Sequence, residues 1–286
     1  MAHGNDQAEA VAEEVVSINN AGVICLEAGK LAEAARYFQH ALALSNDTSR
    51  IALSRAQHNY LSDFSQIEIP SFSPDHKAAN MAHIYQRGEY DEGMNTFSSP
   101  VRLEKNLGLG VDHLSAKVIV LYNMGQLHLR LNEDNSAAEF FYEALPLAQM
   151  SPNNSRGSSS LIAILHNLGH IQYRIGNHNE AMSTYASALT VARHSFGECH
   201  LDVASTLNCI GVLYFHMPRA ETNKALELYI EALSIRRAIL GDEHPDVATT
   251  LNNIGRVHYL EGAYDDALEK YLEALRIRRI VFGENH

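Results

Sequence analysis

Cysteine, excess positive charge and long apolar runs are all scarce in this sequence of 286 residues. Its three cysteines, Cys25, Cys199 and Cys209, form no C-x-x-C pair, which favours buried free thiols in a reducing compartment over a disulfide framework. A formal net charge of −12 argues against nucleic-acid partners and an anionic membrane surface. No stretch reaches the roughly 18 apolar residues of a membrane helix, and the acidic start does not resemble a signal peptide. These absences predict a cytoplasmic protein with neither nucleic acid nor membrane as a partner.

Catalytic motifs are missing as well. The sequence contains no H-E-x-x-H, G-x-x-x-x-G-K-[ST], G-x-G-x-x-G or G-x-S-x-G pattern. His166 and His170 have the four-residue spacing of metal ligands on a helix, but no third ligand can be identified beside them. The sequence therefore predicts no enzyme, no metal and no cofactor. A catalytic role would require the purified protein to retain a stoichiometric metal or cofactor.

What the sequence does contain is a repeated pattern anchored on a glycine. An alanine follows each anchor by twelve residues, or by fourteen in one unit. An aromatic residue comes four positions later, and another alanine three positions after that. The last four anchors are 42 to 44 residues apart, which indicates one supersecondary unit used repeatedly. The five anchors are Gly22, Gly125, Gly169, Gly211 and Gly255.

Each unit is predicted to be two antiparallel helices joined by a tight turn. A glycine seven residues after the anchor, at Gly29, Gly176 and Gly262, allows the chain to reverse with positive φ. The anchors and alanines are small because helix backbones approach closely there, and the aromatic residue fills the remaining space. A single pair cannot bury its apolar face, so neighbouring pairs stack. We therefore predict an all-α fold, a right-handed α-solenoid of antiparallel helix pairs.

The joins between units carry helix-end signals. In "GDEHPDVATT", Gly241 follows one helix, and Asp242 or the stretch around His244 caps the next. Pro245 and Asp246 suit the first turn of that next helix. Arginines close the second helices, where they complement the helix dipole as a solvated cluster or, alternatively, form a basic docking patch. They are Arg236, Arg237, Arg276, Arg278 and Arg279.

The stretch "LNNIGRVHYLEGAYDDALEKYLEAL" resembles a tetratricopeptide repeat, and five units share its pattern. The period of about 42 residues and the "IRR…(L/F)G-x-x-HPDVA…LNN" joins resemble the kinesin light chain subtype. The resemblance covers roughly residues 9–45 and 113–286. It predicts a first helix pair over 1–45 and four tandem repeats over 113–286, at about 113–150, 158–196, 200–240 and 244–282. Between them, residues 46–112 contain Pro70, Pro74 and Pro100 and are predicted to be an irregular insertion or a degenerate unit.

First helices of such a solenoid line a concave groove. One stripe of each helix, starting six and three residues before the anchor and continuing one and four after it, is expected to face that groove. Amides there can hold the backbone of an extended peptide, and aromatic rings add contact area. By resemblance to kinesin-light-chain-type repeats, Asn208 and Asn252 would hold the peptide. The predicted groove residues are Asn208, Asn252, Arg256, His166, His170, Tyr173, Phe215 and Tyr259.

A second asparagine position, two residues before the anchor, is interpreted as a helix-packing position. It is occupied by Asn20, Asn123, Asn167 and Asn253. The groove stripe of the clear units contains one cation, Arg256, which does not favour a clamp for a free C-terminal carboxylate.

The leading functional hypothesis is therefore a scaffold or adaptor that binds a partner protein, as an extended peptide, in the groove. The alternative is a ligand-sensing or self-gated solenoid in which residues 46–112 cover the groove. At the C-terminus, "FGENH" repeats the joins "FGECH" and "LGDEH" without a following helix. This predicts either self-association at that end or further repeats that are missing from the sequence.

Overall fold

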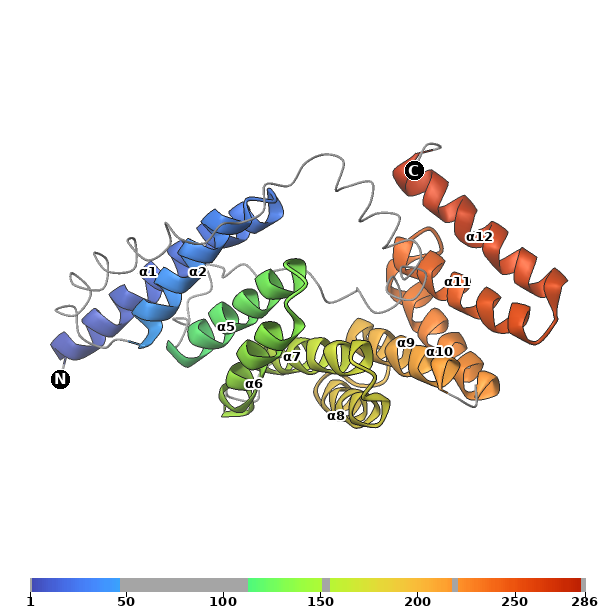
Figure 1. The fold of residues 1–286 in the computed structure, drawn as a ribbon, viewed down its shortest axis with the longest axis horizontal. Helices are drawn as coiled ribbons and strands as arrows, with labels where there is room; N and C mark the ends of the chain where they lie inside the picture. Colours follow the sequence, from blue (N-terminus) through green and yellow to red (C-terminus); the bar gives the residue numbers. More distant parts are fainter. Residues whose placement is uncertain (1, 47–112, 151–154, 218–220, 284–286) are drawn as a thin grey trace. The chain divides into compact units, whose positions relative to one another are not determined.

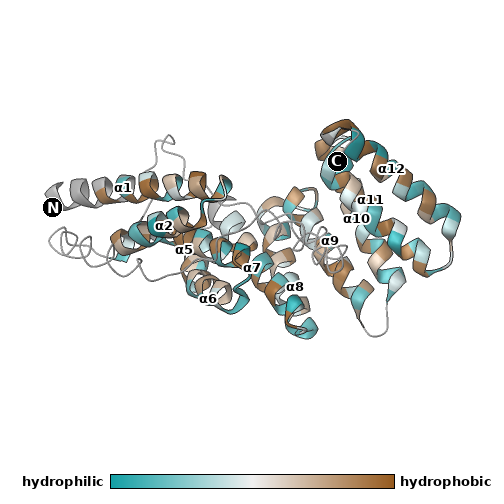
Figure 2. Cartoon of the chain, turned by 45° about the horizontal axis from the view of Figure 1, so that its top comes forward, coloured by the Kyte–Doolittle hydropathy of each residue, from teal (hydrophilic) through white to brown (hydrophobic). Residues whose placement is uncertain are grey.

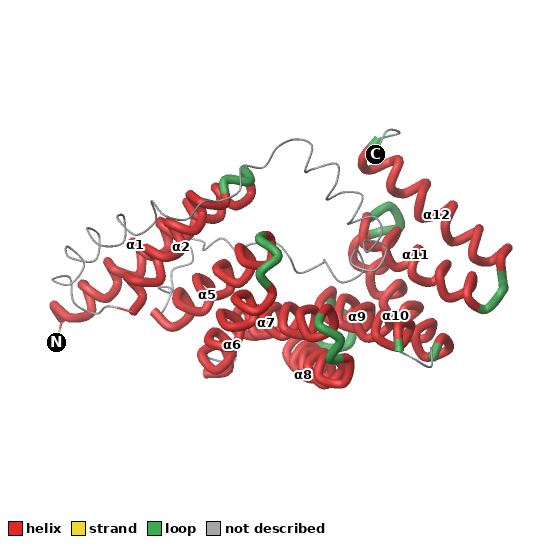
Figure 3. The backbone as a smooth tube through the Cα atoms, in the orientation of Figure 1, coloured by secondary structure: helices red, strands yellow, loops and turns green. Residues whose placement is uncertain are grey.

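Every described element of the protein is an α-helix. The computed structural model describes residues 2–46, 113–150, 155–217 and 221–283 (Figure 1). Within these ranges no strand occurs, and the helices are linked by short turns (Figure 3). The all-α prediction is confirmed. The predicted insertion at 46–112, and with it the gating alternative, lies outside the described residues except for Asn46.

The helices belong to two compact units. The first contains α1 (Ala2–Glu27), α2 (Leu31–Asn46), α5 (His113–Arg130) and α6 (Asp134–Met150). The second contains α7 (Ser155–Arg174), α8 (His178–Phe196), α9 (Leu201–His216), α10 (Thr222–Leu240), α11 (Pro245–Leu260) and α12 (Tyr264–Phe282).

Both units are built from stacked helix pairs. Consecutive helices pack together as α1–α2, α5–α6, α7–α8, α9–α10 and α11–α12. Within each unit the second helix of one pair also packs on the first helix of the next: α2 on α5, α8 on α9 and α10 on α11. First helices contact one another as well, α1 with α5, α7 with α9 and α9 with α11. This is the predicted α-solenoid of helix pairs.

The anchor glycines are required because an aromatic ring lies directly against each of them. A methyl group added at Gly211 would lie 2.6 Å from Cε1 of Tyr229, and one at Gly125 would lie 2.6 Å from Cε1 of Phe141. Ordinary carbon–carbon contacts are about 3.5–4.0 Å, so no larger residue fits without displacing the ring. The same pairing joins Gly22 to Phe38, Gly169 to Tyr185 and Gly255 to Tyr271.

In four of the pairs the turn uses a residue with positive φ, which is Gly29, Asn132, Gly176 or Gly262. Gly262 has φ 78°, and its neighbour Ala263 donates its backbone N–H back to the carbonyl of His258, 2.9 Å away. In the unit anchored at Gly125, the equivalent residue is Asn132, with φ 59°. Asparagine tolerates this conformation better than other residues with a Cβ, which explains how that unit lacks the turn glycine.

Histidines cap the first helices at two joins. His244 Nδ1 accepts a hydrogen bond from the backbone N–H of Asp246 at 3.1 Å, with Pro245 in the first turn. His200 does the same for the N–H of Asp202 at 3.2 Å. The predicted role of the stretch around His244 is confirmed, and it is the histidine rather than Asp242 that caps α11.

Each unit has its own apolar core. In the first unit, Leu26, Phe38 and Leu127 pack together between α1, α2 and α5. In the second, Leu213, Tyr229 and Val257 belong to one cluster of α9, α10 and α11. Figure 2 shows the resulting alternation of hydrophobic and hydrophilic residues along the helices. Each fully buried large side chain stabilises its unit by about 1.5–3 kcal/mol.

Candidate functional site

The predicted groove asparagine Asn208 does not lie on an open surface. Its side chain is fully buried between α9 and α11, where Oδ1 accepts a hydrogen bond from Nδ2 of Asn253 at 3.0 Å. The first unit repeats this pair: Nδ2 of Asn123 on α5 donates to Oδ1 of Asn19 on α1 at 2.9 Å. Both asparagine positions of the repeat thus join neighbouring first helices. The packing role expected for Asn123 and Asn253 is present, and Asn208 shares it; Asn252 on α11 is half-buried.

His166 and His170 are buried on α7 instead of lining an open face. Nε2 of His166 lies 2.7 Å from Oγ1 of Thr206 on α9. Because the single hydroxyl hydrogen of Thr206 is donated to the carbonyl of Asp202, Nε2 of His166 must be the donor in this contact. Burial lowers the pKa of His166 to about 3, which keeps the ring neutral. His166 therefore joins α7 to α9 where other repeats use asparagine.

Within the described parts of the chain, no three His, Cys, Asp or Glu side chains gather closely enough to hold a metal ion.

Three predicted groove residues, Tyr173, Phe215 and Arg256, do come together, and His216 joins them in what we call the aromatic–arginine cluster. Its members are half-buried and come from three successive first helices, α7, α9 and α11. The ring of His216 lies 6.0 Å from that of Tyr173 and 4.9 Å from that of Phe215, between centroids. Cζ of Arg256 lies 4.5 Å from the centroid of Phe215. The cluster thus places one cation among three rings.

The electrostatics of the cluster hold Arg256 in place. Burial lowers the pKa of His216 to about 4, with further contributions from the nearby Arg256 and His178. His216 is therefore neutral at pH 7, so its Nε2 can accept a hydrogen bond from Nη2 of Arg256 at 3.3 Å. The face of Phe215 adds a cation–π attraction of about 0.5–2 kcal/mol. A guanidinium oriented in this way suits carbonyl or carboxylate acceptors of a ligand.

Tyr259 is separate from this cluster. It is 58% exposed at the end of α11, and its ring pairs with that of Tyr264 at the start of α12, 5.5 Å between centroids. The ladder predicted from Tyr173, Phe215 and Tyr259 therefore divides into the cluster and an exposed tyrosine pair. Sequence reasoning missed His216 and Tyr264. The adjacency of His216 to Phe215 was the available signal for one of them.

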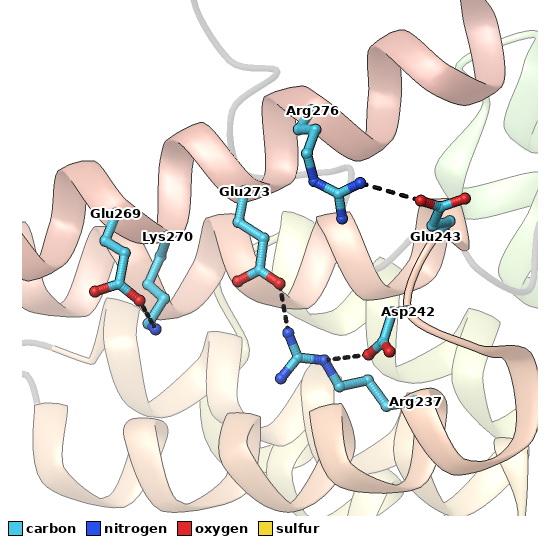
Figure 4. Close-up of polar contacts among 7 residues, drawn as sticks. All are labelled: Arg237, Asp242, Glu243, Glu269, Lys270, Glu273 and Arg276. Carbon is cyan, nitrogen blue, oxygen red and sulfur yellow. Dashed lines mark hydrogen bonds and ion pairs between the residues drawn. The ribbon is translucent and has the colours of Figure 1, made fainter.

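The arginines that close the second helices do not form one solvated cluster. Arg236 is fully buried, and its Nη1 donates to the carbonyl of Asp246 at 2.9 Å and to Oγ1 of Thr250 at 2.6 Å. The solvated interpretation is therefore wrong for this residue. Two others form ion pairs, Arg237 with Asp242 and Glu273 and Arg276 with Glu243 (Figure 4).

The fold and these contacts define a class: a helical-repeat solenoid with a polar and aromatic first-helix surface. Models of the tetratricopeptide repeat match residues 15–48, 164–197 and 202–280, together just over half of the chain. The chain belongs to the tetratricopeptide repeat proteins. No curated protein sequence matches it. Repeats of this family typically act as non-enzymatic interaction scaffolds.

Solved structures share the fold at low sequence identity. BtubC (BKLC) from P. vanneervenii is 20% identical, with a TM-score of 0.52 over 98% of this chain and 93% of that one. The apo form of RapI is 13% identical, with a TM-score of 0.58 over 94% and 71% of the two chains. The putative kinesin light chain TPR-like repeats of Podosopora anserina are 14% identical, with a TM-score of 0.47 over 70% and 92% of the two chains. These likenesses concern the fold alone.

None of the described helices combines the length and apolar character needed to span a bilayer.

Proposed function

We propose that this protein is an interaction scaffold that binds an extended segment of a partner protein across the C-terminal ends of α7, α9 and α11. The observation that carries the proposal is the aromatic–arginine cluster, which spans three successive first helices. Stacked repeats present their first helices as one extended surface, and a peptide lying across it would contact each repeat in turn.

The chemistry of this surface suits a peptide backbone with an acidic or carbonyl-rich segment. Tyr173 and Phe215 offer rigid apolar area at low entropic cost. Arg256, oriented by His216, can donate to carbonyl or carboxylate oxygens, and the half-buried amide of Asn252 lies one turn before it on α11. The exposed ring of Tyr259, one turn after Arg256, extends the surface toward α12. Asn208, His166 and His170 are left out of this surface because they are buried.

A site-specific photo-crosslinker tests the proposal. Placed at Tyr259, beside the cluster, it should form adducts with a partner from a native lysate. Placed at Tyr142, which is similarly exposed (52%) but lies on the second helix α6, it should not.

Specificity is then checked with Arg256→Ala and Tyr173→Ala, each introduced into the crosslinking protein. We expect a roughly five- to thirtyfold loss of affinity and a corresponding loss of the adduct at Tyr259, since removing one anchoring contact costs about 1–2 kcal/mol of binding. Far-UV circular dichroism reports whether the helices are retained. Adducts of equal yield at both positions, or an adduct insensitive to both variants, would contradict the proposal.

A further inference from the structure

The helices α10 and α12 occupy equivalent positions in successive repeats but are covered differently. On α10, Leu233 packs against the buried cluster of Val247, Ala248 and Leu251, which lies mainly on α11. Its equivalent on α12, Leu275, is 41% exposed. Leu226 on α10 is half-buried, while its equivalent, Leu268, is 55% exposed. At these two positions α12 thus exposes apolar residues that are more deeply covered on α10, whereas Leu272 and its α10 equivalent Ile230 are exposed to a similar extent, 55% and 53%.

These residues form a continuous stripe along α12, which we call the α12 stripe: Tyr264, Leu268, Leu272 and Leu275. Their exposures are 64%, 55%, 55% and 41%. Spacings of four, four and three residues place them on one side of the helix. An isolated exposed leucine is ordinary, but a stripe of four large apolar side chains on one helix indicates an interaction surface.

The charges beside the stripe indicate what it binds. The first half of α12 carries Asp265 and Glu269, and the last half carries Arg276 and Arg279. An antiparallel copy of the same helix would present its basic half to the acidic half of the first. With Leu272 opposite Leu272, Asp265 lies level with Arg279 of the other copy, and Glu269 lies within one residue of the level of Arg276. Antiparallel pairing also sets opposite helix dipoles side by side.

We propose that α12 is a homodimer interface, in which the stripes of two copies pack antiparallel about a two-fold axis at Leu272. Such an interface is isologous, because each copy contributes the same residues. The Leu and Tyr side chains form its apolar centre. Two symmetric sets of ion pairs, Asp265 with Arg279 and Glu269 with Arg276, flank that centre and fix the antiparallel register.

Existing contacts do not oppose this arrangement strongly. Arg276 Nη1 lies 3.1 Å from Oε1 of Glu243, but both side chains are at least half exposed (Figure 4). Glu269 pairs with the adjacent Lys270 at 2.7 Å, and the Glu269 side chain is 68% exposed. Exposed pairs of this kind contribute little to stability, so their carboxylates and guanidinium can exchange partners at little cost.

The interface should be weak. A single pair of helices buries less than the roughly 1,200–2,000 Å² of a stable protein–protein interface. We therefore expect a concentration-dependent dimer, with a dissociation constant on the order of 10 µM.

Sedimentation equilibrium of the 286-residue protein, from about 1 to 300 µM, brackets that constant. The average mass should rise from the monomer value of 31.7 kDa toward twice that value. Leu272→Glu, which sets two carboxylates against each other at the axis, should abolish the rise. Ile230→Glu is the matched control, because Ile230 is the equivalent residue on α10 and is 53% exposed. It should leave the association unchanged.

A charge exchange separates this interface from any other occupant of the stripe. Asp265→Arg and Arg279→Glu should each weaken association at least tenfold, since each creates like-charge contacts. An equimolar mixture of the two variants should associate again, because each ion pair is then restored across the axis. A protein that stays monomeric at the highest concentration would overturn the proposal. So would a mixture that associates no better than its components; the stripe would then belong to a further helix or a foreign partner.

Discussion

The two second helices α10 and α12 share the same pattern but differ in their surroundings. α10 packs against α9 and α11, whereas α12, among the described helices, packs mainly against α11. As a result Tyr229 is buried and its equivalent Tyr271 is half-buried, and Arg236 is buried while Arg278 is half-buried. The repeat pattern thus determines the helix, and the neighbouring repeat determines how much each side chain contributes to stability.

The largest difference in stability is expected between substitutions of Arg236 and Arg278, which occupy equivalent positions on α10 and α12. Arg236→Ala should lower the free energy of unfolding by about 3 kcal/mol, because it leaves a cavity and removes the donor to Oγ1 of Thr250. Arg278→Ala, at the equivalent position, should cost less than about 1 kcal/mol. Urea denaturation followed by circular dichroism measures both. Equal losses would show that the covering of α10 by α11 has no energetic consequence.

The burial of His166 on α7 predicts that the folded protein loses stability in acid. The pKa of His166 is lowered to about 3, so below its unfolded value of 6.5 the unfolded chain binds a proton that the folded chain excludes. Stability should therefore fall by about 2–3 kcal/mol between pH 6.5 and pH 4. α12 contains no histidine, so no buried imidazole on that helix adds to this loss.

His166→Asn isolates the effect, since asparagine occupies the equivalent position in α1 and α9 as Asn19 and Asn208. Denaturation curves at pH 7, 5.5 and 4 should show a shallower pH dependence for this variant than for the wild-type chain. An unchanged slope would assign the acid sensitivity to other groups.

Local rules made the helix pairs predictable. The anchor glycine, the alanines and the aromatic residue lie within about thirty residues of one another, so their spacing is visible in the sequence. The cap at His244 and the turn at Gly262 follow from the same short-range chemistry. Even the exception at Asn132 uses a residue known to tolerate positive φ.

The burial of the polar residues was not predictable from short-range patterns in the same way. The angular position of Asn208 around its helix, taken alone, predicts an open face. Its burial depends on how closely α11 approaches, and the bond to Asn253 spans 45 residues. Arg236 is a similar case. A basic residue in a closing turn is usually solvated, but its partners Ser205 and Thr250 come from two other helices.

Substitutions of the anchor glycines that face α10 and α12 should differ by less in their effect on stability. Gly211→Ala places a methyl group 2.6 Å from the buried ring of Tyr229, which has no room to move, so we expect a loss of about 2 kcal/mol. Gly255→Ala meets Tyr271 at 2.8 Å, but that ring is only half-buried and can shift outward. Its loss should be about 1 kcal/mol or less. Thermal denaturation of the two variants should rank them in this order, and the reverse ranking would contradict the argument.

The smallest difference in stability is expected between two ion pairs, that of Arg237 with Glu273 and that of Arg276 with Glu243. Glu273 on α12 joins Arg237 on α10 at 2.6 Å, and its side chain is 29% exposed. Glu243 joins Arg276 with both side chains more than half exposed. Glu273→Gln should therefore cost about 0.5–1 kcal/mol and Glu243→Gln nearly nothing. Raising the salt concentration to about 1 M should reduce the first loss by screening. Glu273 joins the second helices of two adjacent repeats, α10 and α12. A greater loss for Glu273→Gln than for Glu243→Gln would show that even a partly exposed ion pair strengthens this junction. The outer side of α12 has no such junction among the described residues.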